Sequence, residues 1–335
     1  MSKLRWGVLS TSNFAQKKVI PAMRACSHAE IAAIASRDLT RSRAAALMHS
    51  IPKAYGSYEE LLADPEIDIV YNPMPNHMHV PWSIRAMEAG KHVLCEKPLG
   101  LSVAEVRSMI AARDRAGVKA GEAFMIRTHP QWSRGKDLVT QGAIGTLRAV
   151  QSEFSYFNND PANVRNKLDI GGGGLMDVGC YSVQLSRFLF GEEPRRVIGL
   201  LDRDPDLRVD RLCSAMMDFP SGQSVFTCGT QHVPYQRVQI LGSKGRIELE
   251  IPFNAPPDET VRLLIDDGSD PRGTGIRVET IAACSQYAIQ ADAFSRAVRD
   301  GGSVAVPLED SLGNMAAIEA IFRSAESGKW ETPER

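Results

Sequence analysis

Short apolar runs alternate with stretches of helical spacing over the first 122 residues. The runs are rich in Val, Ile, Leu and Ala, which is typical of β-strands buried on both faces. The expected strands are Arg5–Leu9, Glu30–Ala35, Ile67–Tyr71, Lys91–Cys95 and Val118–Ala123. The expected helices are Phe14–Ala25, Thr40–His49, Val80–Gly90 and Ser102–Gly117. This alternation predicts an α/β domain over residues 1–122, with a doubly wound parallel sheet covered by helices.

The pattern changes after about residue 123, where strand-like runs follow one another with turns between them. These runs are Ala149–Phe157, Arg196–Leu201, Leu212–Phe219, Ser224–Gln231, Arg237–Leu241 and Arg246–Ile251. We expect helices at Leu175–Phe190, Gln286–Arg299 and Leu308–Ser327 to cover one face of the resulting sheet, and Asp266–Gly275 to form an exposed loop. Residues 123–335 are therefore expected to form an α+β domain with a mostly antiparallel open sheet, which binds substrate and mediates oligomerisation.

The composition narrows the possible partners. The chain has 335 residues, 43% of them hydrophobic, and its 39 basic and 40 acidic side chains give a net charge of −1. Such a balance gives no overall attraction to nucleic acid or to an anionic membrane, and no apolar run is long enough to span a bilayer. The six cysteines are scattered without a Cys-x-x-Cys pair, so we expect reduced thiols, no metal site and no disulfides. Because the apolar pattern starts almost at Met1, we expect no export signal and a cytoplasmic location.

The turn after the first strand contains small residues at the positions where a dinucleotide-binding loop has glycines. Ser10 and Ser12 take the first two glycine positions, and Ala15 takes the third. Small residues let the backbone approach a pyrophosphate, and a helix N-terminus supplies N–H donors. The alternative is a serine-rich turn that only caps a helix. The predicted pyrophosphate contacts of this Rossmann domain are Ser10, Thr11, Ser12, Asn13 and Phe14.

The end of the second strand bears on the choice of cofactor. NAD usually meets an acidic residue there, whereas the 2′-phosphate of NADP needs a cation. The sequence has Ser36 and Arg37 at this place, with Arg41 one helical turn later. These residues favour NADP, but Asp38 beside them keeps NAD possible.

Three longer segments resemble the glucose-fructose oxidoreductase, inositol dehydrogenase and rhizopine catabolism (Gfo/Idh/MocA) family. They are Pro75–His79, Gly90–Pro98 with its Glu-Lys-Pro motif, and Gly171–Tyr181 with the pattern Gly-Gly-Gly-x-x-x-Asp-x-Gly-x-Tyr. The resemblance covers nearly the whole chain. Within the family, the chain looks closest to dimeric dihydrodiol dehydrogenases and NADP-dependent D-xylose dehydrogenases.

The resemblance implies that Lys97, Asp177 and Tyr181 are catalytic. Lys97 would lie beside the nicotinamide, in a Lys97-Pro98 peptide that is often cis, and Asp177 and Tyr181 would face it from the second domain. Most members have His where this chain has Tyr181. The spacing is consistent with this, because two residues four apart on a helix share one face.

Two assignments of the proton remain open. Tyr181 would carry the proton if the ammonium of Lys97 favours its phenolate form and polarises the substrate carbonyl. Alternatively, Lys97 transfers the proton and Tyr181 binds substrate, and Asp177 orients the substrate hydroxyl or holds Lys97 in either case.

The resemblance also implies further contacts. Arg165 lies where the family often has a Trp-Arg pair, but the Trp position is Val164 here. The additional cofactor contacts are Pro73, Asn76, His79, Glu96, Lys97 and Arg165. The substrate contacts are Lys97, Tyr156, Asn158, Arg165, Asp177 and Tyr181.

The expected activity is therefore NAD(P)-dependent hydride transfer to or from a sugar, a polyol or a related cyclic alcohol or ketone, by a homodimer or homotetramer. Two alternatives share the fold: a regulatory protein that senses a dinucleotide without turnover, and a glycosidase that recycles NAD. The presence of Lys97, Asp177 and Tyr181 together argues against the first, and release of NADPH would argue against the second.

Overall fold

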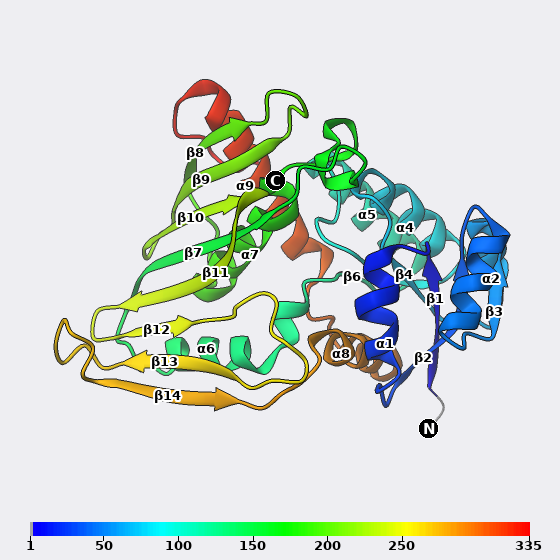
Figure 1. Ribbon diagram of the computed structural model, residues 1–335, viewed down its shortest axis with the longest axis horizontal. Helices are drawn as coiled ribbons and strands as arrows, with labels where there is room; N and C mark the ends of the chain where they lie inside the picture. Colours follow the sequence, from blue (N-terminus) through cyan, green and yellow to red (C-terminus); the bar gives the residue numbers. More distant parts are fainter. Residues whose placement is uncertain (1–2) are drawn as a thin grey trace. The chain divides into compact units, whose positions relative to one another are not determined.

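The computed structural model describes residues 3–335, which form two compact units (Figure 1). Unit 1 combines the chain up to Thr128 with the later segment Ser285–Ser311. Unit 2 combines His129–Cys284 with Leu312–Arg335. Within the described residues no helix is long and apolar enough to cross a membrane.

Unit 1 contains a six-stranded parallel sheet in the order β3-β2-β1-β4-β5-β6. Its strands are β1 (Leu4–Leu9), β2 (Ala29–Ala35), β3 (Lys53–Tyr55), β4 (Ile69–Asn72), β5 (His92–Cys95) and β6 (Ala120–Glu122). Its helices are η1 (Ala15–Val19), α1 (Ile20–Met23), α2 (Leu39–Met48), α3 (Tyr58–Ala63), η2 (Asn76–Met78), α4 (His79–Glu88), α5 (Val103–Ala116), η3 (Met125–Thr128) and α8 (Gln286–Asp300). The predicted Rossmann architecture is confirmed, and the strand order reverses between β1 and β4, where such folds bind ligands.

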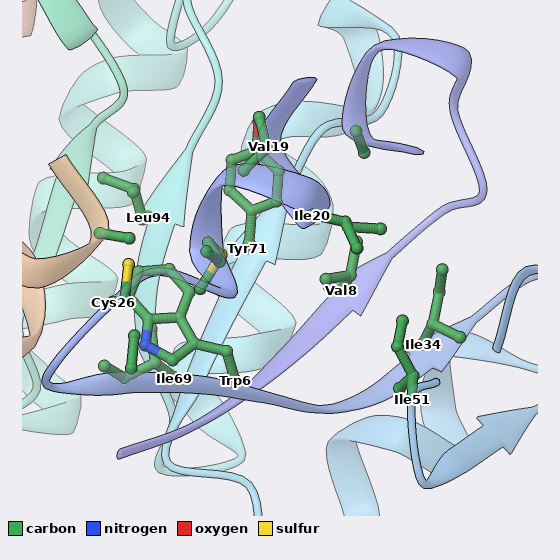
Figure 2. Close-up of a cluster of buried hydrophobic side chains, with 14 of the residues drawn as sticks. Trp6, Val8, Val19, Ile20, Cys26, Ile34, Ile51, Ile69, Tyr71 and Leu94 are labelled. Carbon is green, nitrogen blue, oxygen red and sulfur yellow. The ribbon is translucent and has the colours of Figure 1, made fainter. Parts of the chain in front are cut away.

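The core of unit 1 joins distant parts of the chain. Trp6 and Tyr71 are buried among aliphatic side chains from β1, β2, β4 and α1 (Figure 2). The indole Nε1 of Trp6 donates to Ser295 Oγ of α8 at 3.1 Å, and its ring meets Phe294 edge-on at 5.8 Å. We expected α8 to cover the second sheet, and this was wrong. Its apolar face completes the core of unit 1 instead.

Unit 2 is built on an eight-stranded sheet in the order β14-β13-β12-β11-β7-β10-β9-β8. Its strands are β7 (Leu147–Phe157), β8 (Arg196–Arg203), β9 (Asp210–Asp218), β10 (Gln223–Gly229), β11 (Gln231–Gly242), β12 (Arg246–Leu249), β13 (Val261–Asp266) and β14 (Ile276–Ile281). Only the pair β7 and β10 is parallel among these described strands, so the predicted mostly antiparallel sheet is confirmed.

One face of this sheet packs against helices. The helices of unit 2 are α6 (Pro130–Thr140), η4 (Val164–Asn166), η5 (Leu168–Ile170), η6 (Leu175–Gly179), α7 (Cys180–Phe190) and α9 (Leu308–Ser327), the last beginning in unit 1. Gly199 of β8, for example, donates its N–H to Ser324 Oγ of α9 at 3.0 Å. The cysteines are free thiols, and all but Cys284 are buried.

Several elements were not predicted from the sequence, namely β3, α3, α6, β13 and β14. The strand β3 has three half-buried residues, too few for an apolar period to be visible. The strands β13 and β14 flank the polar segment that we did expect to be a loop, and β14 is largely exposed.

Candidate active site

The helical turns that follow β1 begin with a row of unpartnered N–H groups. Ser12 caps them, because its Oγ accepts from Ala15 N at 3.2 Å and its carbonyl accepts from Gln16 N at 3.0 Å. Within the described residues, the backbone N–H groups from Thr11 to Phe14 have no hydrogen-bond acceptor. Helix N-termini with free donors are favourable places for phosphate oxygens. The loop therefore fits the pyrophosphate of a dinucleotide.

Ser10 adopts the backbone conformation that a glycine would have at this turn. Its φ is +100°, in the left-handed half of the Ramachandran plot, which residues with a Cβ rarely occupy. Its N–H donates to the carbonyl of Ala35 at 2.9 Å, which ties the loop to the end of β2. The degenerate motif thus keeps the shape of a glycine-rich turn at some cost in strain.

Two cations gather at the end of β2. Burial raises the pKa of Tyr58, and the positive charges of Arg37 and Arg41 oppose this rise, so both guanidinium groups lie near that phenol. Asp38 has another task. Its Oδ1 accepts from Thr40 N at 2.8 Å and from Arg41 N at 3.4 Å, so it caps α2. Ser36 is buried, and its Oγ accepts from the Asp38 N–H at 3.3 Å.

The loops after β4 and β5 are joined by a buried imidazole. His79 is 1% exposed, with Nε2 at 2.7 Å from the Met74 carbonyl and Nδ1 at 2.8 Å from the Pro98 carbonyl. Burial lowers the pKa of His79 to about 4, so the neutral ring donates to one carbonyl only. Pro73 is buried in the first of these loops, and Asn76, which starts η2, is half-buried. His79 therefore fixes the two loops relative to each other.

Lys97 lies in the second of these loops, half-buried, and its peptide bond to Pro98 is cis, as the resemblance implied. The carboxylate of Glu96 before it accepts from Tyr71 OH at 2.6 Å and from Lys97 N at 3.3 Å. Glu122 Oε1 accepts from Leu99 N at 2.8 Å. Two buried carboxylates thus hold the backbone on both sides of Lys97.

Unit 2 contains a compact cluster around Asp177 of η6. Tyr156 OH of β7 donates to Asp177 Oδ2 at 2.6 Å, and Arg165 Nε lies 3.1 Å from both carboxylate oxygens. Burial and the neighbouring carboxylate raise the pKa of Tyr156, and the carboxylate also raises the pKa of Arg165. The raised pKa values keep Tyr156 a neutral phenol and Arg165 a guanidinium at neutral pH. In the described part of the chain, the two Nη atoms of Arg165 have no hydrogen-bond partner.

Tyr181 follows Asp177 by four residues and lies in the first turn of α7. It is 5% exposed, and its ring meets Phe154 edge-on at 5.7 Å and Phe253 at 5.5 Å. The turn between Asp177 and Tyr181 is π-helical rather than α-helical. Such single π turns interrupt helices frequently at functional sites.

Asp210, the first residue of β9, lies at the start of this helix. It is 1% exposed, and its Oδ2 accepts from Leu175 N at 2.6 Å. Burial raises the pKa of Asp210 to about 6, although N–H donors and Arg203 act against the rise. This contact was not predictable from the sequence, because an Asp at the start of a strand has no motif around it.

The comparisons with known proteins decide the family. Residues 4–124 match the family described as oxidoreductase family, NAD-binding Rossmann fold, and residues 132–248 match the GFO/IDH/MocA C-terminal domain. An uncharacterized oxidoreductase of Rhizobium meliloti is 47% identical over 99% of this chain and 100% of its own. The chain belongs to the Gfo/Idh/MocA family.

Relatives in this family include the subgroup that the sequence indicated. D-xylose 1-dehydrogenase (NADP(+)) 2 of Haloferax volcanii is 39% identical over 97% of this chain and 98% of its own. Trans-1,2-dihydrobenzene-1,2-diol dehydrogenase of Mus musculus is 34% identical over 74% of each chain. Among solved structures, a variant of a 3-ketoreductase from Actinomadura kijaniata, in complex with TDP-benzene and NADP, has a TM-score of 0.89 at 27% identity, covering 96% and 98% of the two chains.

The structure distributes the predicted residues of this Gfo/Idh/MocA protein over its two units. The nucleotide loop, Arg37, Arg41 and Lys97 belong to unit 1, whereas Asp177 and Tyr181 belong to unit 2. Tyr156, Arg165 and Asp177 come together as one cluster. Asn158 has another role, because its Oδ1 accepts from Asp160 N and Asn166 Nδ2 and so shapes the following loop. Val164 is 41% exposed where the family often has Trp.

Proposed function

We propose that this protein is an NADP-preferring dehydrogenase or reductase that acts on a sugar, a polyol or a related cyclic alcohol or ketone. The observation that carries the proposal is the row of free N–H groups from Thr11 to Phe14. It adjoins the end of β2, where Arg37 and Arg41 gather. A dinucleotide matches this arrangement if its pyrophosphate binds the free N–H groups and its 2′-phosphate binds the two arginines.

The preference for NADP rests on the task of Asp38. An acidic residue at the end of β2 favours NAD when it accepts from the ribose hydroxyls. Here the Asp38 carboxylate accepts from two N–H groups of α2. This leaves Ser36 and the two arginines as the groups that would meet a 2′-phosphate. The NADP named for the xylose dehydrogenase and the ketoreductase supports the same choice.

The bound nicotinamide supplies or accepts the hydride. The protein's task is to orient the substrate and to handle the proton of its oxygen. Asp177 is held by Tyr156 and Arg165, so its carboxylate is fixed before substrate binds. The Nη atoms of Arg165, whose side chain is 40% exposed, remain available to a substrate oxygen. Sugar and polyol hydroxyls suit such a set of donors and acceptors.

We propose that Tyr181 transfers the proton and that Lys97 supplies the positive charge that favours its phenolate. An apolar environment alone disfavours a phenolate, and Tyr181 lies between two aromatic rings, so a nearby ammonium is needed for this role. Transfer of the proton by Lys97, with Tyr181 as a substrate contact, remains the alternative. In both versions negative charge on the substrate oxygen is stabilised by Lys97.

The first experiment measures NADPH and NADH binding by fluorescence, followed by turnover with aldoses, ketoses, anhydro-sugars, inositols and trans-dihydrodiols. We expect Arg37→Ala to weaken NADPH binding by about tenfold or more and to leave NADH binding nearly unchanged. Arg43→Ala is the matched control, because Arg43 is an exposed arginine of α2, the helix that follows Arg37. Equal losses for both cofactors would contradict the preference for NADP.

The second experiment tests the catalytic assignment. Tyr181→Phe and Lys97→Met are each expected to lower kcat by about 10² to 10⁴ while NADPH still binds. The pH profile of kcat for carbonyl reduction separates the two assignments, since the residue that donates the proton determines the basic limb of that profile. The variant that lacks this residue should lose the limb, and the other variant should keep it. Near-normal turnover of both variants would refute the assignment.

We also propose that unit 2 forms a homo-oligomer through the sheet face that α9 does not cover. This face presents exposed apolar side chains on adjacent strands: Phe157, Leu200, Met216, Val225 and Tyr235. Light scattering of the wild type and of Leu200→Glu tests it, and a monomeric wild type would refute it. A cytoplasmic location stays a prediction.

A further inference from the structure

We propose that Asp210 is a positioning residue for Asp177: its buried carboxylate fixes the backbone turn from which Asp177 projects. The inference rests on the proposed function for the roles of Asp177 and Tyr181, and it adds a residue that neither the motifs nor the family resemblance indicated.

The contact runs through two hydrogen bonds of the backbone. Asp210 Oδ2 accepts from Leu175 N at 2.6 Å, a short bond to an ionisable group. The carbonyl of Gly173 in turn accepts from Asp177 N at 3.0 Å. Asp210 thus holds the helix start two residues before Asp177, whereas Tyr156 and Arg165 hold the Asp177 side chain itself.

Gly173 is required for this contact. A Cβ at Gly173 would lie 2.0 Å from Asp210 Oδ1, and the φ of Gly173 is +119°. A Cβ at Gly174 would lie 3.4 Å from Asp210 Oδ2. The glycine run therefore accommodates a carboxylate of the same chain against the first turn of the helix, rather than a bulky ligand.

The Asp210 contact changes which groups the Asp177 side chain binds. An acidic residue in the first turn of a helix is normally drawn to the free N–H groups and the positive end of the dipole. Here Asp210 already satisfies Leu175 N, and Asp177 is left to bind Tyr156 and Arg165. Asp210 takes the structural role of the first-turn acid, and Asp177 keeps the functional one.

Hydrogen exchange of the full-length protein tests the position directly, and it needs no substrate. We expect Asp210→Ala to accelerate exchange of the amides from Gly173 to Tyr181 by about tenfold or more. Asp210→Asn keeps one acceptor oxygen and is expected to fall between Asp210→Ala and the wild type. Asp218→Asn, at the other end of β9 and paired with Arg196 at 2.9 Å, is the matched control. Wild-type exchange in Asp210→Ala and Asp210→Asn, or equal acceleration throughout unit 2, would overturn the proposal.

Turnover then separates positioning from simple loss of folded protein. With a substrate found in the screen described above, and kcat expressed per NADPH-binding site, we expect Asp210→Ala to lower kcat by about tenfold or more. The KM and the NADPH Kd should change less than about threefold, and Asp210→Asn should recover part of kcat. Normal kcat despite faster exchange would refute a role in catalysis. If the wild type turns over none of the compounds, the proposed function fails, while hydrogen exchange still decides whether Asp210 fixes Asp177.

Discussion

Two helix starts of this protein look alike in sequence and differ in what satisfies their N–H groups. Each follows a run of small residues, and each begins with a π-helical turn, η1 in unit 1 and η6 in unit 2. At η1 the N–H groups from Thr11 to Phe14 have no acceptor among the described residues. At η6 the carboxylate of Asp210 accepts from Leu175 N.

The difference teaches how one local design gives a binding site or a rigid support. A helix start without an internal acceptor favours an anion from solution, which here is the proposed pyrophosphate. A helix start with a buried carboxylate has its requirement met, and it can present a nearby side chain in a fixed position. The deciding residue at η6 is 35 positions away in the sequence.

The largest expected effect on stability comes from blocking the hydrogen bond between Asp210 and Leu175 N. Gly173→Ala would place a Cβ 2.0 Å from Asp210 Oδ1 at a φ of +119°. Overpacking and backbone strain together should lower the free energy of unfolding by about 4 kcal/mol, measured by urea denaturation. Gly135→Ala in α6 meets nothing within 4 Å, so this control should be neutral or slightly stabilising. Similar stability of the two variants would contradict the close contact.

The next largest effect, on NADPH affinity, comes from placing an acidic residue at the start of η1. Ser12→Asp keeps an acceptor for Ala15 N but adds a negative charge where the pyrophosphate is proposed to bind. NADPH affinity should fall by roughly a hundredfold, about 2.7 kcal/mol, in a fluorescence titration. Ser57→Asp at the start of α3 is the control, because Ser57 caps Glu60 N in the same way. Unchanged affinity of Ser12→Asp would place the phosphates elsewhere.

A smaller effect follows from the raised pKa of Asp210. Its value of about 6, against 3.8 for an unperturbed Asp, means that the folded state binds the proton more tightly than the unfolded state. The protonated form of Asp210 makes its full contribution to the free energy of unfolding below the unfolded pKa of 3.8. This contribution is lost as pH rises through about 6. Relative to Asp210→Asn, the wild type should lose about 1.4 kcal/mol between pH 5 and pH 8. Arg203 of β8 lowers the pKa of Asp210, and Cys228 of β10 also interacts with Asp210. A hydrogen bond with Cys213 and burial raise the pKa of Cys228 well above its usual value, so this thiol stays neutral in this range. Parallel pH curves for the two proteins would contradict this shift.

The smallest effect concerns the strain in the nucleotide loop. Ser10→Gly should raise the free energy of unfolding by about 1 kcal/mol, since glycine adopts a φ of +100° without a clash. Thermal and urea unfolding would measure it. Ser50→Gly, at a φ of +50°, should gain less because that conformation costs less. A destabilised Ser10→Gly would mean that the hydroxyl contributes more than the strain costs.

The fold was predictable from the sequence wherever the hydrophobic periodicity of a strand or helix was visible. The strands of the parallel sheet and most of the second sheet appear as expected, since their burial leaves a clear apolar pattern. The partner of α8 was not predictable in this way. Its amphipathic pattern indicates that one face is buried, but the sheet that buries it depends on contacts such as Trp6 with Ser295, 289 positions apart.

The residues of the candidate site also divide into those that a local motif indicates and those whose roles depend on distant contacts. Lys97, Asp177 and Tyr181 stand in motifs, and the motifs indicated them. The task of Asp38 became clear only from its bonds to α2, because a single acidic residue after a strand has the same appearance as a ribose ligand or a helix cap. Glu122 and Asp210 accept from backbone N–H groups of distant residues, and Tyr71 donates to the distant carboxylate of Glu96. Nothing local in the sequence marks such roles.

The discontinuous make-up of unit 1 has a consequence for its synthesis. The nucleotide-binding half is encoded first, yet the indole of Trp6 cannot meet Ser295 and Phe294 until the ribosome has nearly finished the chain. The nascent first segment therefore emerges with an uncovered apolar face, which is the kind of surface that chaperones bind. A message truncated before the codon for Ser285 would yield a nucleotide-binding half that lacks the helix needed to close its core.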